Sequence, residues 1–93
     1  MRAFDVVRQV LTHALYNNGL VLDPYTTMEV ATLIHLYITT GSRSHYEGAV
    51  RLLGFVLGKM GYDDAERIAS NIVEEVVNRV DLAAVRRTTD TEA

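Results

Sequence analysis

Residues 23–41, DPYTTMEVATLIHLYITTG, predict a helix with favourable residues at both of its ends. Asp23 is a preferred N-cap residue, because its carboxylate can accept from the free N–H groups of the first turn. Pro24 fits the first helical position, where its missing N–H costs nothing. Gly41 is a preferred stop, since glycine readily takes the left-handed conformation that ends a helix. We therefore expect a helix over 24–40.

Most sides of this helix are apolar. Between its two ends, Glu29 and His35 are the only groups that can carry charge near neutral pH. A helix that is apolar nearly all round needs packing partners nearly all round. We therefore expect helix 24–40 to lie at the centre of a small all-α domain.

Two amphipathic patterns flank the central one. Apolar residues recur at helical spacing over 3–18, and Gly19 follows as a stop. The second pattern covers 45–60, where Ser44 and the Glu47 three positions later form a capping-box sequence. Because the links between the patterns are short, consecutive helices should be neighbours in space.

The longest pattern covers 64–87, and Asp63 is the residue expected to cap it. A break near 78–81, followed by a short last helix, stays open as an alternative. The polar residues 88–93, TTDTEA, predict a flexible tail. The predicted fold is all-α, with four helices in a single domain over 1–87.

Composition excludes several classes of protein. The 93 residues carry a net charge of −3, are 48% apolar and contain no cysteine. These values fit one ordinary globular domain and exclude a disulfide scaffold or a cysteine zinc site. Asp5, Arg8 and Gln9 interrupt the N-terminal apolar pattern, unlike a signal peptide, and no apolar run is long enough to span a bilayer. We expect a soluble cytoplasmic protein that does not enter the membrane.

His35 is the residue of the central helix that most suggests chemistry. Its neighbours one turn away are alanine, threonine and isoleucine, so its own helix supplies neither a second metal ligand nor an orienting carboxylate. The chain has no phosphate loop, no nucleophile elbow, no zinc-protease motif and no dinucleotide fingerprint. We expect a buried His35 bonded to a backbone carbonyl or a threonine, and we predict neither an enzyme nor a cofactor or metal. An enzyme with His35 in a pocket ranks third among the functions considered.

One line along helix 45–60 is informative because it contains glycines. Glu47, Arg51, Gly54 and Gly58 follow one another on the same side. Glycine inside a helix costs about 1 kcal/mol relative to alanine, so its presence there suggests a structural reason. The spacing allows an ion pair between Glu47 and Arg51, followed by bare backbone that another helix can approach closely. That helix can belong to the same chain or to a second subunit.

The predicted length of helix 64–87, roughly 35 Å at about 1.5 Å per residue, exceeds what a globule of this size needs. A helix that overhangs its own core commonly finds a partner on another chain. We therefore expect a non-enzymatic protein–protein interaction module, either a homo-oligomer or a small subunit, adaptor or inhibitor acting on a partner protein. The residues predicted for this interface are Glu47, Arg51, Gly54, Gly58, Val80 and Val85.

Nucleic-acid binding is the alternative function. A local basic patch could form from Arg43, His45, Lys59, Arg86 and Arg87. The negative net charge and the lack of an interleaved aromatic platform count against this alternative.

Two short stretches resemble known modules. Residues 59–68, KMGYDDAERI, resemble the hairpin of helix-hairpin-helix DNA-binding modules, in which backbone N–H groups meet a phosphate. Here Lys59 replaces the first glycine, and Asp63 and Asp64 put negative charge where the phosphate would lie. The same turn together with 71–78, NIVEEVVN, resembles a ubiquitin-associated domain, but the spacing is too short for that family's middle helix. We assign the chain to neither family.

Overall fold

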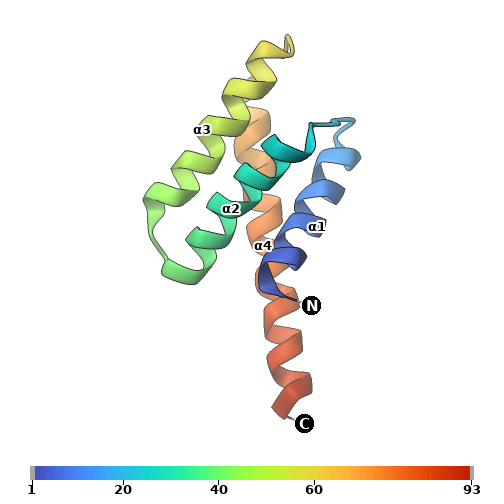
Figure 1. The fold of residues 1–93 in the computed structure, drawn as a ribbon, viewed down its shortest axis with the longest axis vertical. Helices are drawn as coiled ribbons and strands as arrows, with labels where there is room; N and C mark the ends of the chain where they lie inside the picture. The colour runs from blue at the N-terminus through green and yellow to red at the C-terminus, as the bar shows by residue number, and fades with distance from the viewer. Residues whose placement is uncertain (1, 93) are drawn as a thin grey trace.

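The computed structural model describes the backbone of residues 2–92 and the side chains of residues 2–81. Over these residues the chain forms four helices and no strand, which confirms the predicted all-α class. Figure 1 shows α1, α2 and α3 side by side in one layer, with α4 crossing behind it. The helices are α1 (Ala3–Asn17), α2 (Pro24–Thr40), α3 (Arg43–Lys59) and α4 (Ala65–Glu92).

Both ends of α2 form as the sequence predicts. The Asp23 carboxylate accepts a hydrogen bond from the backbone N–H of Thr26 at 2.7 Å and one from its hydroxyl at 2.8 Å. These bonds lower the pKa of Asp23, since they favour the charged carboxylate. At the other end Gly41 has φ of 73°, and its N–H donates to the carbonyl of Tyr37 at 2.7 Å.

The start of α3 differs from the prediction. The helix begins at Arg43, and Ser42 rather than Ser44 takes the N-cap position. The reason is the tight turn: Gly41 leads directly into the extended Ser42, whose carbonyl already accepts from the N–H of His45 at 3.1 Å. Ser44 therefore lies inside the helix, with its hydroxyl 2.9 Å from that of Ser42, and the capping box does not form.

The start of α4 differs from the prediction too, since it lies one residue later. The carbonyl of Asp64 accepts from the N–H of Ile68 at 2.9 Å, so Asp64 and not Asp63 precedes the first helical residue. The Asp64 carboxylate binds the guanidinium of Arg67 at 2.9 Å. This exposed ion pair lies in the first turn, where negative charge favours the helix dipole.

The far part of α4 is continuous. No break occurs at 78–81, and the helix extends to Glu92, past the predicted end at 87 and through most of the segment predicted as a flexible tail. The physical reason is that no glycine or proline follows Gly61, so the chain contains no stop. At about 1.5 Å per residue, its 28 residues span about 42 Å, most of the molecule's 48 Å length.

The central helix is α4, and the prediction that helix 24–40 is central is wrong. α4 packs mainly against α1 and α3, whereas α2 contacts its two neighbours in the layer and touches α4 little. On α2 only Val30, Ala31 and Ile34 are fully buried, and Tyr25 is 80% exposed. An outer-layer helix buries one stripe, so the high apolar content of α2 does not reflect a central position. Among the side chains of α4 that the structure describes, the buried ones are Ala69, Ile72, Val73, Val76 and Val80.

Glycines let α3 approach its neighbours. A Cβ on Gly54 would lie 3.5 Å from the Cα of Glu66 and 3.8 Å from the Cβ of Ala69, both on α4. A Cβ on Gly48 would lie 3.6 Å from a methyl group of Leu33 on α2. These are ordinary van der Waals distances, so alanine fits at both places while larger side chains would push the helices apart.

Replacing Gly48 and Gly41 by alanine should therefore change the free energy of unfolding in opposite directions. Gly48→Ala should raise the free energy of unfolding by about 0.5–1 kcal/mol, because helix interiors favour alanine and the methyl group fits. Gly41→Ala should lower it by about 1 kcal/mol, because alanine is strained at positive φ. Urea unfolding followed by circular dichroism measures both. If both substitutions changed the free energy of unfolding in the same direction, either the left-handed conformation of Gly41 or the free space beside Gly48 would be contradicted.

Candidate protein-interaction site

An open groove of about 790 Å³ runs along the outer side of the α3–α4 pair. Its floor includes the small residues Gly54, Ala65 and Ser70, which follow from the close approach of the two helices. Charged and aromatic side chains of α3 form its rim. The residues that line it are Arg43, Tyr46, Glu47, Val50, Arg51, Gly54, Phe55, Ala65, Glu66 and Ser70.

Arg43 is held at one end of the groove by aromatic packing. Its guanidinium carbon lies 4.7 Å from the ring centroid of Tyr46, and that ring packs edge-on against Tyr37 with centroids 5.1 Å apart. Burial, and next the negative charge of Glu74, raise the pKa of Tyr46. The Tyr46 hydroxyl is therefore neutral at physiological pH and keeps its proton for hydrogen bonding.

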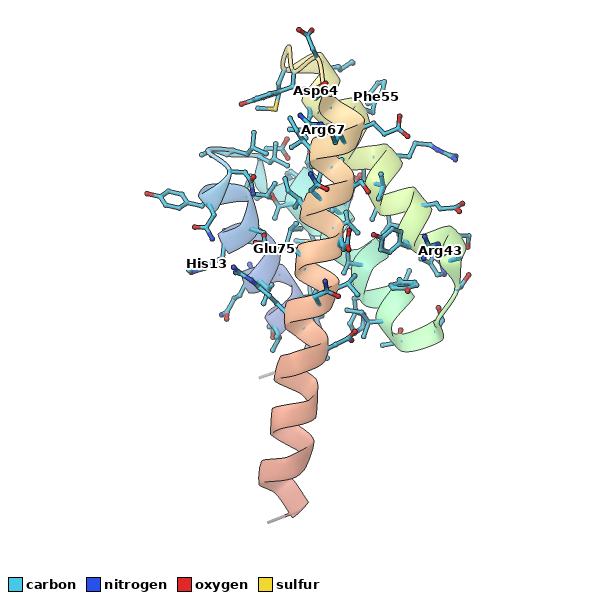
Figure 2. The ribbon with its side chains drawn as sticks, turned by 180° about the vertical axis from the view of Figure 1, so that it is seen from behind. His13, Arg43, Phe55, Asp64, Arg67 and Glu75 are labelled. Carbon is cyan, nitrogen blue, oxygen red and sulfur yellow. The ribbon has the colours of Figure 1, made fainter. Side chains whose placement is uncertain are left out.

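Phe55 is an exposed apolar side chain at the other end of the groove. The residue is 62% exposed, although phenylalanine is among the residues most often buried. The ammonium nitrogen of Lys59 lies 5.0 Å from the centroid of its ring. Figure 2 shows Phe55 and Arg43 toward the two ends of α3, on the same side of α4.

Glu47 and Arg51 lie between these ends. Both are exposed, and the predicted ion pair between them is absent from the described side chains, whose two ion pairs are Asp64–Arg67 and Glu75–Arg79. Each charge therefore keeps its full capacity for a partner outside the chain.

The remaining predicted interface residues divide into three groups. Gly54 and Gly58 face Glu66 and Ala65 of the same chain, which is the intramolecular alternative for the glycine line. Val80 belongs to the chain's own core, where it is 5% exposed. Val85 lies outside the side chains that the structure describes.

Phe55 and Tyr46 were missed as site residues. The signal for Phe55 was its position four residues after Arg51, which continues the line that starts at Glu47. It was obscured because a phenylalanine on a helix is usually counted with the core. The half-buried ring of Tyr46 packs against Tyr37 and also supports Arg43.

The predicted basic patch is not continuous over the described side chains. Arg43 and Lys59 occupy opposite ends of α3, and Glu47 lies between them on the same row. His45 is half-buried. Arg86 and Arg87 lie outside the described side chains.

His35 is half-buried rather than buried, and it packs on an aromatic ring. Its imidazole meets Phe4 edge-on, with ring centroids 5.9 Å apart at 90°. The predicted bond from the imidazole to a carbonyl or threonine is absent among the described residues; instead, the Thr39 hydroxyl donates to the backbone carbonyl of His35 at 3.0 Å. No group of three or more potential metal ligands occurs in residues 2–81.

Comparison of the chain with protein-family models, with curated proteins and with solved structures finds no match. Among the described residues, none of the helices combines the length and the apolar character needed to cross a membrane. The functional argument therefore depends on the groove and its side chains.

The packing of His35 gives a direct test of whether it is structural. His35→Leu should leave the free energy of unfolding within about 1 kcal/mol of the parent or raise it, because leucine keeps the contact with Phe4 and no imidazole hydrogen bond is lost. Ile34→Ala, at the adjacent fully buried position, is the control and should cost about 2–5 kcal/mol. Urea titration measures both. A loss above about 2 kcal/mol for His35→Leu would indicate a polar role for the imidazole.

Proposed function

We propose that this protein is a non-enzymatic helical interaction module that binds other protein chains through the groove between α3 and α4. It would act as a self-associating subunit, or as an adaptor or inhibitor on the surface of a partner. The observation that carries the proposal is Phe55: a large apolar ring, 62% exposed, in a groove beside two unpaired charges.

This combination matches the usual anatomy of a protein interface. Interfaces have a core enriched in aromatic side chains, with charged groups at a wetter rim. A few aromatic and arginine residues commonly supply most of the binding energy. Phe55 would be the buried anchor, while Glu47 and Arg51 would fix the orientation of the partner.

The backbone of α4 supports the same proposal from a second direction. Figure 1 shows its last turns, coloured red, extending past the ends of the other three helices. Backbone that extends past the other helices is accessible to a second chain.

A matched pair of serine substitutions tests the proposal. Phe55→Ser should abolish retention of partner chains by the immobilised protein, because it removes the apolar anchor. Tyr16→Ser is the control, since Tyr16 is also an exposed aromatic residue, at 76%, but lies at the end of α1 outside the groove. Quantitative mass spectrometry of proteins retained from a cell lysate, with a differently tagged copy of the chain added, measures the loss.

The pattern of loss decides the outcome. Partners retained by the parent and by Tyr16→Ser, but lost with Phe55→Ser, are the expected result. Equal retention by all three proteins, or retention by none, would contradict binding through the groove. Circular dichroism must show that all three are equally folded.

A further inference from the structure

We infer that the groove of one chain receives α3 of a second copy, in an antiparallel pair around a two-fold axis that passes close to position 49. In this arrangement Glu47 lies opposite the partner subunit's Arg51, and Phe55 lies opposite the partner subunit's Arg43. The inference rests on the proposed function and names its partner.

The first argument is the row of exposed side chains along α3. Every fourth residue from Arg43 to Lys59 is exposed, so the row forms one ridge of the kind that packs into a groove of a neighbouring helix. The order along the ridge is positive, negative, positive, aromatic and positive. Its members are Arg43, Glu47, Arg51, Phe55 and Lys59.

The second argument is charge complementarity: when two copies of this row lie antiparallel, residues of opposite charge face each other. A two-fold axis pairs residues that are equally distant from it on the two chains. An axis midway between positions 47 and 51 also lies midway between positions 43 and 55. One axis therefore creates two Glu47–Arg51 ion pairs and places two arginines beside exposed phenylalanine rings, where a cation is attracted to the ring face.

Other arrangements lose this complementarity. In a parallel pair of α3 helices, each charged side chain lies opposite the same side chain of the second copy, so like charges face each other. An antiparallel pair with its axis at position 51 sets the two Arg51 side chains against each other and brings Arg43 against Lys59. Like charges placed together across an interface are costly.

Two competing antiparallel registers keep only part of this complementarity. An axis midway between positions 43 and 47 would pair Arg43 with the partner subunit's Glu47 and leave Arg51 and Phe55 opposite no residue of the row. An axis midway between positions 51 and 55 would pair Glu47 with the partner subunit's Lys59. The groove decides among the three registers. Its α3 lining runs from Arg43 to Phe55 and is centred on position 49, and Lys59 lies outside it. Arginine is also the better partner for a carboxylate, because its planar fork can donate two bonds.

The room for the second α3 comes from the residues beside the ridge. On the α4 side the lining residues are Ala65, Glu66 and Ser70. Ala65 and Ser70 are small, so the ridge of α3 projects above them, and the Glu66 carboxylate adds a negative charge to the groove. The half-buried Val50 lies close to the proposed axis and supplies apolar contact there. Association would also cover the exposed ring of Phe55, which is the main gain from removing apolar surface from water.

Charge reversal tests this register in the full chain. Glu47→Arg and Arg51→Glu should each weaken self-association by at least about tenfold, because each converts both ion pairs into repulsions. A one-to-one mixture of these two variants should associate again, since every altered position then faces the opposite charge. Sedimentation equilibrium of each protein and of the mixture measures the effect, with circular dichroism to confirm folding.

Lys59→Glu is the control for the competing register that pairs Glu47 with the partner subunit's Lys59. It should not weaken self-association, because in the proposed register Lys59 faces no carboxylate of the partner, whereas with the axis midway between positions 51 and 55 the substitution sets two carboxylates against each other. A strong loss with Lys59→Glu, or equal association of all the single variants, would overturn the inference. A mixture of Glu47→Arg and Arg51→Glu that associates no more tightly than either variant alone would also overturn the inference.

The inference and the proposed function can fail separately. A parent protein that stays monomeric at concentrations near 1 mM, about the weakest association that counts as specific, would overturn the pairing of two copies. The proposed function would still stand if Phe55→Ser removed a different protein partner. The proposed function would be contradicted if Phe55→Ser left the retention of every partner chain unchanged.

Discussion

The structure depends on the burial of one stripe of α4 against α1 and α3. Ala69, Ile72, Val73 and Val76 are almost completely buried there. Several of these residues are β-branched and therefore weaken the intrinsic tendency of α4 to form a helix. Their burial, about 1.5–3 kcal/mol for each large side chain, compensates for this weakness. α4 thus forms as a helix because it is packed. By crossing the layer it joins α1 and α3 through a second helix besides α2.

The same packing creates the outer groove. Gly54 brings α3 within van der Waals contact of the α4 backbone at Glu66, so the two helices meet along small residues. On the outer side of that contact, the larger side chains of α3 project beyond the small residues of α4. Phe55 and Arg51 are therefore exposed as a consequence of the close approach that the core requires. The candidate site follows from the fold in this sense, although its occupant does not.

Local signals in the sequence predicted local structure well. Asp23 and Gly41 determine the ends of α2 through bonds within a few residues, so the sequence was sufficient. Ser44 had an equally good local pattern, yet Ser42 took the position because the turn after Gly41 is only as long as one extended residue. The packing order of the helices was not predictable in this way. The apolar content of α2 indicated burial, but only tertiary contacts reveal that α4 crosses the layer and leaves Tyr25 exposed.

For the same reason, the candidate site could be predicted from the sequence only in part. The spacing identified Glu47 and Arg51 as neighbours on one face, but spacing alone does not determine whether their side chains pair. The glycine line was recognised, and its two alternatives were separated only when Gly54 was found against Glu66 of the same chain.

Native-state hydrogen exchange tests most directly the claim that α4 is the central helix. Amides in the most tightly packed helix exchange only when the whole protein unfolds, whereas those of outer elements open more easily. The amides of Val73 and Val76 on α4 should therefore exchange most slowly, and those of Val30 and Ile34 on α2 should exchange faster. Slower exchange in α2 than in α4 would contradict the account.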